Sequence, residues 1–593
     1  MLTHAIRTSL RYLRSRVFFT GVNLLGLTVG LSVCFLTGLY VQFELGYDAY
    51  HERADRIYRL VTDVETSVGT RYESTSAPMA PALQSAFAEV ENATRILLDY
   101  LIVQPEDRSS FGEETVAYAD PFVFSIFTLP LISGDATTAL VAPFSVILSA
   151  TAAQRFFGTT DCLGQTLLLD NSPATVTGVM QDMPANSHVR TDILVSMATL
   201  LKAWNPSMSQ QWSRFGFYTY LLLPANANAA ELSRKFTQYV RKRVPSEQSY
   251  SLAIEPLTQV YLSGKARGSR TGRSVHGSIR NVYLASTVAL LVLFVACFNF
   301  INLTAALSLQ RTKEVNVRRV LGASRQQLVG YFLLDAALIS LVASLLALLL
   351  SALLLSWFNQ LVGSEILSHV LSHWPNVGWL ILMALLVGGI SGSYPAWLLL
   401  GSPVADGFEG RRAPKLSGDF LPRVLIIAQF ATCVVLMVAT AVVYRQLDYL
   451  QSADPGFDKE RQVVVDFHFN DELVSQRSRI KQQLTDVPGV LKVSLSSSVP
   501  GRANRTLLTR IEDSHHKFQE LMIDAYFVDY GFLDQYDISV VAGRKFSEER
   551  ASDTTEAMLV MKLRFGSWAT LLRRKPLGNA SNRRASGERS SGW

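Results

Sequence analysis

The sequence predicts an α-helical membrane protein with about five transmembrane helices and two α+β extracytoplasmic domains, the second of them incomplete. Two observations predict this fold class. The first is a set of five runs without a charged residue, at 17–43, 281–310, 336–364, 374–405 and 424–444. Each is long enough for a membrane-spanning helix, which needs about 20 mostly apolar residues. The second is a pair of polar blocks, 45–280 and 446–593, each long enough to bury its own core.

Charge near the ends of these runs predicts the topology, because Lys and Arg are retained on the cytoplasmic side. Four arginines precede the first run, at positions 7, 11, 14 and 16, and basic residues fill the loop after the second run. The loop between the third and fourth runs has no Lys or Arg. The N-terminus is therefore expected in the cytoplasm and both polar blocks outside.

These patterns divide the chain into segments. We expect a cytoplasmic amphipathic N-terminal helix at 1–17, span 1 at 18–43, a first extracytoplasmic domain at 44–280, spans 2–4 within 281–405, a cytoplasmic loop at 406–423, span 5 at 424–444, a partial second extracytoplasmic domain at 445–561 and a divergent tail at 562–593. The tail is basic, rich in Ser and Gly and poor in apolar residues, a composition typical of disorder.

Composition also argues against several classes of function. Three of the four cysteines, Cys34, Cys297 and Cys433, lie inside predicted spans, which leaves Cys162 without an exported partner for a disulfide or a zinc site. The net charge of +6 follows topology and the tail, so nucleic acid is not an expected partner. His188, with Asp182 and Asp192 nearby, could form an acid–base or metal cluster, but a surface turn is the expected reading. No catalytic residue, cofactor or metal is predicted.

An internal repeat links the two polar blocks. The strand-like segment at 145–148 has a counterpart at 557–560. Before these segments, a five-residue pattern recurs with identical spacing: Asp120, Phe127, Leu129, Leu131 and Gly134 become Asp529, Tyr536, Ile538, Val540 and Gly543.

Small and amide residues inside the spans are candidates for helix packing. Gly26 and Gly30 form a G-x-x-x-G pair that lets another helix approach closely. Intramembrane amides either mark a substrate path or bond between helices, and the second use is the expected one here. The complete set of packing candidates is Gly26, Gly30, Asn299, Asn302, Gly388, Gly392 and Pro395.

The loop at 309–328 is the most strongly patterned part of the chain. Val317, Val320 and Leu321 fall on one helical face, and Gly322 is a natural helix C-terminus. Ser324 with Gln327 forms a capping-box pattern that starts the next helix. The sequence thus predicts a short amphipathic helix, a sharp turn and a new helix that becomes span 3. An ordinary positive-inside loop also explains the charge.

Several stretches resemble one family. FNFINLTAALSLQRTKEVNVRRVLGASRQQLVGYFLLDAALIS looks like the core of the MacB/FtsX-type ABC transporter permeases. The stretch NLLGLTVGLSVCFLTGLYVQFELGYDAYHERADRIYRL is similar to the family's N-terminal span and its approach to the periplasmic core domain. VTGVMQDMPANSHVRTDILVS and VDYGFLDQYDISVVAGRKFS are similar to its exported-domain signatures. The resemblance reaches about Met561, where a complete duplicated permease would continue, so a truncated or frame-changed C-terminus is expected.

The resemblance implies a multi-pass permease of the bacterial inner membrane, in contact with membrane lipids, that a cytoplasmic ABC ATPase dimer drives through the 309–328 loop. The chain has no G-x-x-x-x-G-K-[ST] phosphate loop, so ATP hydrolysis is expected on a separate subunit and this chain is not expected to be an enzyme. The expected ATPase-coupling residues are Arg311, Lys313, Glu314, Arg318, Arg319, Gly322, Ala323 and Arg325.

The same resemblance leaves the work of the permease open. One reading is export or extraction of a peptide, drug or lipoprotein, with a periplasmic adaptor and a dimeric or pseudo-dimeric assembly. The alternatives are an FtsX-like signalling regulator of an exported hydrolase or sensor, and an inactive truncated remnant.

Overall fold

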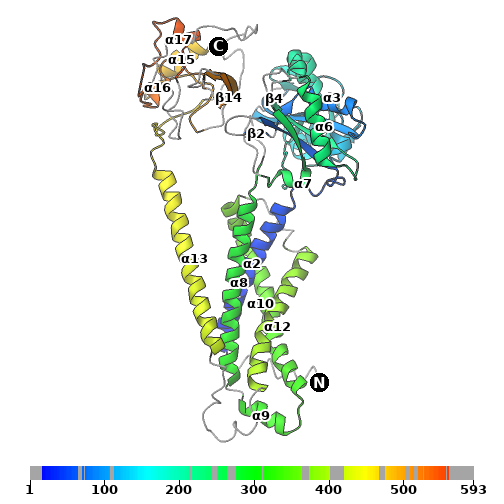
Figure 1. The fold of residues 1–593 in the computed structure, drawn as a ribbon, viewed down its shortest axis with the longest axis vertical. Coiled ribbons are helices and arrows are strands. Elements are labelled where there is room, and N and C mark those ends of the chain that lie inside the picture. The colour runs from blue at the N-terminus through cyan, green and yellow to red at the C-terminus, as the bar shows by residue number, and fades with distance from the viewer. Residues whose placement is uncertain are drawn as a thin grey trace. The chain divides into compact units, whose positions relative to one another are not determined.

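The computed structural model describes residues 17–559, apart from gaps at 65–69, 73, 107–111, 213–214, 244–249, 264–274, 310–311, 364–370, 372, 401–419, 466–474, 502–505, 513–517, 525 and 556. The chain forms two compact units (Figure 1). The membrane unit comprises residues 1–47 and 277–453, and the extramembrane unit comprises residues 48–276 and 454–593. The helix expected within 1–17 and the tail at 562–593 lie outside the described residues, except for Val17.

The membrane unit contains the five apolar helices that the sequence predicts. They are α2 (Val17–Leu45), α8 (Ile279–Leu309), α10 (Arg325–Val362), α12 (Trp374–Leu400) and α13 (Phe420–Ser452). Each charge-free run overlaps one of these helices, but the ends differ by several residues. In particular, α10 begins at Arg325, directly after the turn at Gly322, so it starts 11 residues before the third run.

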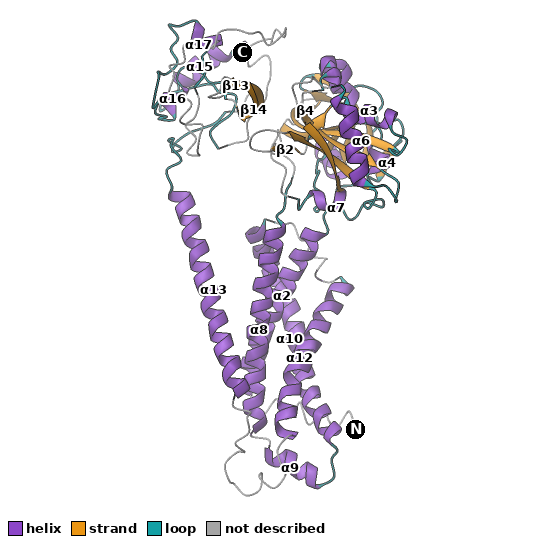
Figure 2. Ribbon diagram, in the orientation of Figure 1, coloured by secondary structure: helices purple, strands orange, loops and turns teal. Residues whose placement is uncertain are grey.

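Four of these helices share one core (Figure 2). Helix α2 packs against α8 and α10, and α10 packs against α12. Their outer faces carry large exposed apolar side chains such as Leu345, Leu353 and Leu386. Apolar side chains that face outward in this way fit a lipid solvent, in which hydrophobic residues need no burial against protein. Helix α13 packs against α8, and no residue of its most apolar stretch is buried.

Residues 48–276 form an α+β domain around one mainly antiparallel sheet. The strand order is β12-β1-β11-β4-β5-β10-β7-β9-β6, with β2, β3 and β8 paired beside this path. The strands are β1 (Ile57–Val64), β2 (Thr70–Tyr72), β3 (Thr75–Ser76), β4 (Asn92–Pro105), β5 (Gly112–Ala119), β6 (Leu131–Gly134), β7 (Ser145–Ser149), β8 (Thr166–Leu169), β9 (Ser172–Met180), β10 (Ile193–Ser196), β11 (Phe215–Leu222) and β12 (Tyr250–Pro256). The helices are α3 (Met79–Ala86), α4 (Val123–Ile126), α5 (Ala150–Phe157), η1 (Thr199–Trp204), η2 (Pro206–Gln210), α6 (Ala229–Arg241) and α7 (Leu257–Val260).

The domain's cores follow from the alternation of its strands, because successive side chains of a strand point to opposite faces. Tyr118 and Val116 of β5 enter one core cluster, while Ala117 and Ala119 of the same strand enter another. Helix α6 fills a third cluster through Leu232, which lies one helical turn from Phe236. Strand β7 is buried at every position, and its sequence accordingly has a continuous apolar run in place of alternation between apolar and polar residues.

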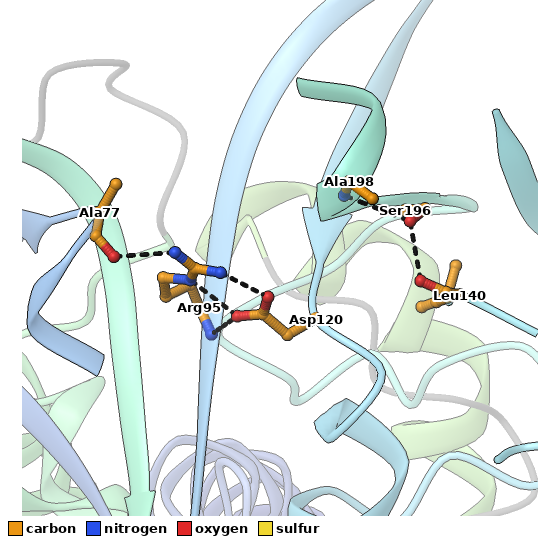
Figure 3. A network of polar contacts seen from close by, with 6 residues as sticks. All are labelled: Ala77, Arg95, Asp120, Leu140, Ser196 and Ala198. Carbon is orange, nitrogen blue, oxygen red and sulfur yellow. Dashed lines mark hydrogen bonds and ion pairs between the residues drawn. The ribbon is translucent and has the colours of Figure 1, made fainter. Parts of the chain in front are cut away.

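A network of polar contacts joins β4 to the start of α4 (Figure 3). The guanidinium of Arg95 donates to both oxygens of Asp120, from Nε at 2.8 Å and from Nη2 at 2.7 Å. The Arg95 amide donates to the same carboxylate at 2.9 Å, and Nη1 donates to the carbonyl of Ala77 at 2.8 Å. Two parallel bonds between charged groups are stronger and more directional than a single contact. Asp120 therefore anchors the loop that carries α4 to the sheet.

The second polar block repeats this local geometry. Its described elements are α15 (Arg477–Thr485), β13 (Thr506–Glu512), β14 (Phe518–Asp524), α16 (Phe532–Gln535) and α17 (Ser552–Thr555). Helix α16 lies where the predicted repeat places the counterpart of α4, and Gly134 and Gly543 share a left-handed φ of 98° and 90°. The Nζ of Lys481 donates to Asp529 at 2.6 Å, in the place of the Arg95 contact.

One expectation from the repeat is wrong. The strand expected at 557–560 is not present in its described part, residues 557–559. In the first block the matching strand, β7, is held between β9 and β10. Strand formation needs such partners, because a strand supplies only half of each backbone hydrogen-bond pair. No strand of the second block's described part fills that role.

Candidate coupling site

The patterned loop forms an elbow at one end of the membrane unit (Figure 2). Helix α9 (Thr312–Val320) precedes the elbow and α10 follows it. The predicted helix end at Gly322 is confirmed, since its φ is 91° and the amides of Gly322 and Ala323 donate to the carbonyls of Arg319 and Arg318 at 3.1 and 2.9 Å. This pair of bonds is the Schellman motif. It fixes the direction in which the chain leaves α9.

The capping box that starts α10 is also confirmed. The Ser324 hydroxyl accepts from the Gln327 amide at 3.3 Å, and the Gln327 side chain accepts from the Ser324 amide at 2.9 Å. These bonds satisfy two helix-terminal donors. The turn is thereby closed on both sides by hydrogen bonds, which makes the elbow a defined element of structure.

One face of α9 is fastened to the membrane unit. Val315 is buried in a cluster with Leu328 and Phe332 of α10 and Ala396 of α12. The Arg318 guanidinium lies 4.6 Å from the centre of the Tyr331 ring, in a cation–π contact with α10. Helix α9 is therefore in direct contact with both α10 and α12.

The opposite face of α9 is open. Val317, Val320 and Leu321 are 47%, 67% and 81% exposed. Apolar side chains gathered on one exposed face often mark an interaction site. The sequence places these three residues on one face through an i, i+3, i+4 apolar pattern, but none of them is among the expected coupling residues, most of which are charged.

The predicted coupling residues are only partly described. Arg318 and Arg319 are half-buried, Gly322 and Arg325 are exposed, and Ala323 packs partly against the Val315 cluster. Lys313 and Glu314 lie in α9, but their side chains are outside the described part of the chain, as is all of Arg311.

The predicted packing residues fall into two groups that the structure brings together. A Cβ added at Gly30 would lie 2.5 Å from Ala296 of α8, and one added at Gly26 would lie 3.1 Å from the amide of Asn299. Between α12 and α10, a Cβ at Gly388 would lie 2.5 Å from the Ser340 hydroxyl.

The second group continues at Gly392, where an added Cβ would lie 2.8 Å from Ala336. Asn302 is half-buried in α8. Pro395 lies within α12, which continues to Leu400, and the Pro395 side chain is not among the described ones.

The expectation of a surface turn at His188 is wrong. His188 is 2% exposed, and its Nδ1 lies 2.8 Å from Asp48, at the beginning of the domain. Asp182 accepts from Thr151, and Asp192 accepts from the hydroxyl of Ser149, so the three residues grouped by sequence do not converge. Sequence proximity could not reveal the true partner, because it lies 140 residues away.

Comparisons with known proteins agree with this architecture. Residues 20–239 match the MacB-like periplasmic core domain, and residues 286–404 match the FtsX-like permease C-terminal domain. The macrolide export ATP-binding/permease protein MacB of Neisseria meningitidis is 25% identical over 221 residues, which are 37% of this chain and 31% of that protein. MacB of Azoarcus sp. is 21% identical over 366 residues, or 58% and 51% of the two chains.

A further relative is the pyoverdine export ATP-binding/permease protein PvdT of Pseudomonas syringae, 25% identical over 46% of this chain and 39% of that protein. The chain thus spans about a third to a half of the curated relatives it matches. The periplasmic region of MacB from Actinobacillus actinomycetemcomitans aligns at 14% identity and a TM-score of 0.26, over 34% of this chain and 90% of that one. A TM-score this low does not define a fold.

Apolar spans, the sheet domain and the FtsX-like segment together define a multi-pass membrane permease of the ABC-transporter class. Within that class, the chain belongs to the MacB/FtsX-type permeases.

Proposed function

We propose that this chain is the permease subunit of an ABC transporter in a bacterial inner membrane, driven by an ATPase dimer on separate subunits. The N-terminus and the elbow face the cytoplasm, where the basic residues lie, and the sheet domain lies outside. Motion of the sheet domain exports or extracts a substrate such as a peptide, a drug or a lipoprotein. The observation that carries the proposal is the two-sided character of α9, which is fastened to the bundle on one face and open on the other.

The path of the proposed motion differs from the one that the sequence suggested. The loop pattern pointed to spans 2 and 3, but the described contacts of α9 are with α10 and α12, which are spans 3 and 4. A push on the open face is received by Val315 and passed to Phe332 and Ala396. Gly392, one helical turn before Ala396, sits directly against Phe332 and Ala336. Because the two backbones are in close contact with little free volume between them, we expect α10 and α12 to move together.

The apolar face of α9 supplies most of the proposed binding to the ATPase. Burying an exposed apolar side chain at an interface is favourable in proportion to the apolar area removed from water, while charges that stay at the exposed rim contribute less to affinity. Val320 and Leu321 are suited to such a role because burying them costs no desolvation of charge. Arg318 is already engaged with Tyr331 and is less available to a partner.

Co-purification tests this assignment. The double change Val320→Glu and Leu321→Glu should weaken association with the cytosolic ATPase at least about tenfold, since each buried anchor contributes about 1 kcal/mol or more. The change Arg318→Glu with Arg319→Glu should weaken it less. Affinity is measured with purified permease in nanodiscs and the ATPases found in its pull-down.

The matched control is Val141→Glu, which places the same charge on an exposed valine of the sheet domain. This variant should bind the ATPase normally. Unchanged binding of the double variant at α9 would remove the coupling role from the elbow. Recovery of an exported hydrolase or a sensor kinase in place of a transport substrate would favour the regulatory alternative.

A further inference from the structure

The chain enters the sheet domain through a turn, residues 48–56, that is held by two histidines. Asp48 begins this turn, is fully buried and adopts a left-handed φ of 58°, which Asp tolerates better than most residues. Its amide donates to the Asn186 carbonyl at 2.9 Å. Its carboxylate accepts from the His188 amide at 3.2 Å and lies 2.8 Å from Nδ1 of the same histidine.

The His188 ring continues this contact into the sheet. Its Nε2 lies 2.6 Å from the hydroxyl of Tyr220, a fully buried residue of β11. The amide of His188 therefore bonds to Asp48 while its ring contacts Tyr220, so Asp48, His188 and Tyr220 together attach the start of the turn to β11.

His51 forms the second attachment, and its geometry is different. Its Nδ1 accepts the amide of Thr128 at 3.1 Å, in the loop after α4. The adjacent amide of Glu52 donates to the Thr128 hydroxyl at 2.9 Å. The His51 ring packs between Tyr50 and Phe127, with centroids 4.0 and 5.0 Å away. A ring nitrogen that accepts an amide proton cannot itself carry one, so this hydrogen bond exists only while His51 is neutral.

The surroundings of His51 oppose its protonation. The pKa of His51 is lowered to about 4, chiefly by burial; Asp48 acts in the opposite direction, and His188 adds a smaller lowering contribution. Tyr50, which stacks on the ring, has a pKa raised to about 12 by burial and stays a donor to the Ser187 hydroxyl. The loop after α4 faces His51 with the Phe127 ring and the Thr128 amide, and β11 contributes Tyr220 beyond His188.

We propose that His51 is a pH-controlled latch: the neutral imidazole holds the turn at 48–56 against the loop after α4, and protonation releases it. The Asp48–His188–Tyr220 attachment stays closed, so the turn opens on one side only. The proposal goes beyond the permease role and does not depend on it. In the topology proposed above, the latch would respond to the pH outside the cytoplasmic membrane.

The direction of the effect follows from proton linkage. In the open turn His51 is hydrated and titrates near its ordinary value of about 6.5. In the closed turn, His51 binds a proton only at much lower pH. Between the two pKa values His51 is therefore protonated in the open turn and neutral in the closed one. The free energy that favours the closed turn is therefore at its maximum above about pH 6.5, and it decreases as the pH drops toward 4. Over this range the open fraction should rise up to about a hundredfold.

Amide hydrogen exchange on the full chain in nanodiscs tests the latch. Peptides covering 46–56 and 121–130 are followed between pH 7 and 4.5, and their rates are normalised to those of the unfolded chain. The wild type should lose protection as the pH falls. His51→Gln retains an acceptor for the Thr128 amide but cannot titrate, so its protection should stay constant. His276→Gln, a control at an exposed histidine, should behave as the wild type.

Two results would overturn the proposal: protection in the wild type that does not change with pH, or an unchanged pH dependence in His51→Gln. If that variant does not fold, exchange at the C2 position of the histidine rings gives the titration of His51 in the wild type directly. A midpoint well below 6.5 supports the latch, and a midpoint at the ordinary value for histidine contradicts it.

Discussion

Replacing Gly388 with leucine should disrupt the packing of α12 on α10. Even a single added carbon at this position would lie 2.5 Å from the Ser340 hydroxyl and 3.2 Å from the Ala336 carbonyl. Ser340 is fully buried, and the Ala336 carbonyl belongs to the backbone of α10, so the helices would have to move apart to admit the larger side chain. Overpacking usually costs 1–3 kcal/mol, and a leucine against a backbone carbonyl should cost about 3 kcal/mol or more. Thermal unfolding in detergent, followed by size-exclusion chromatography, measures the loss.

The neighbouring glycine supplies the control for this change. Gly389 has no atom within 4 Å of an added Cβ, so Gly389→Leu directs the same side chain into open space. It should insert and unfold like the wild type, since an outward leucine on a membrane helix meets lipid. Equal unfolding temperatures for the two leucine variants would show that α10 and α12 do not pack as described.

These two glycines show what local pattern predicts and where it stops. The sequence named Gly388 and Gly392, but not Gly389, as packing residues, and both lie against α10. What the sequence did not show is the partner side, Ser340 and Ala336, because these residues lie on another helix. The partner of Gly30 was equally hidden, because Ala296 has no feature that distinguishes it from other alanines in α8.

The elbow could be predicted in more detail because its signals are local. The helix end at Gly322 and the capping box of Ser324 with Gln327 are encoded within a few residues of each other. What the elbow contacts was not predictable in the same way. The burial of Val315 and the exposure of Leu321 depend on where α10 and α12 run, and a helical pattern alone gives two faces without saying which one is covered.

The polar contacts of the sheet domain were the least predictable part. Asp48 and His188 each lie in a stretch that resembles a family signature, yet nothing in either stretch identifies the other as its partner. Long-range pairs of this kind are decided by strand order, which brings the turn before β1 next to the loop before β10. The internal repeat correctly predicted local features, such as the position of α16. Its predicted strand is absent at 557–559, because a strand there needs neighbouring strands to pair with.

Replacing Asp120 with alanine should lower the free energy of unfolding of the sheet domain by about 2–3 kcal/mol. The change removes three hydrogen bonds and leaves Arg95 with a charge that is only 13% exposed. A buried charge without its counterion is more costly than the loss of the contacts themselves. For a domain of this size, the unfolding temperature should fall by about 5–10 °C. Thermal unfolding of the full chain, with hydrogen exchange to assign the transition to β4 and β5, measures it.

The repeat provides a matched comparison within the same chain. Asp529 occupies the equivalent position, but its ion pair is with Lys481, which is 37% exposed and makes a single contact at 2.6 Å. Exposed pairs of this kind contribute at most about 1 kcal/mol, because solvent screens them and the lysine stays hydrated when its partner is removed. Asp529→Ala should therefore have a much smaller effect than Asp120→Ala. Asp120→Asn, which keeps one acceptor for Arg95, should fall between the two. If both alanine variants cost the same, then burial of the Arg95 guanidinium is not what makes the first contact important.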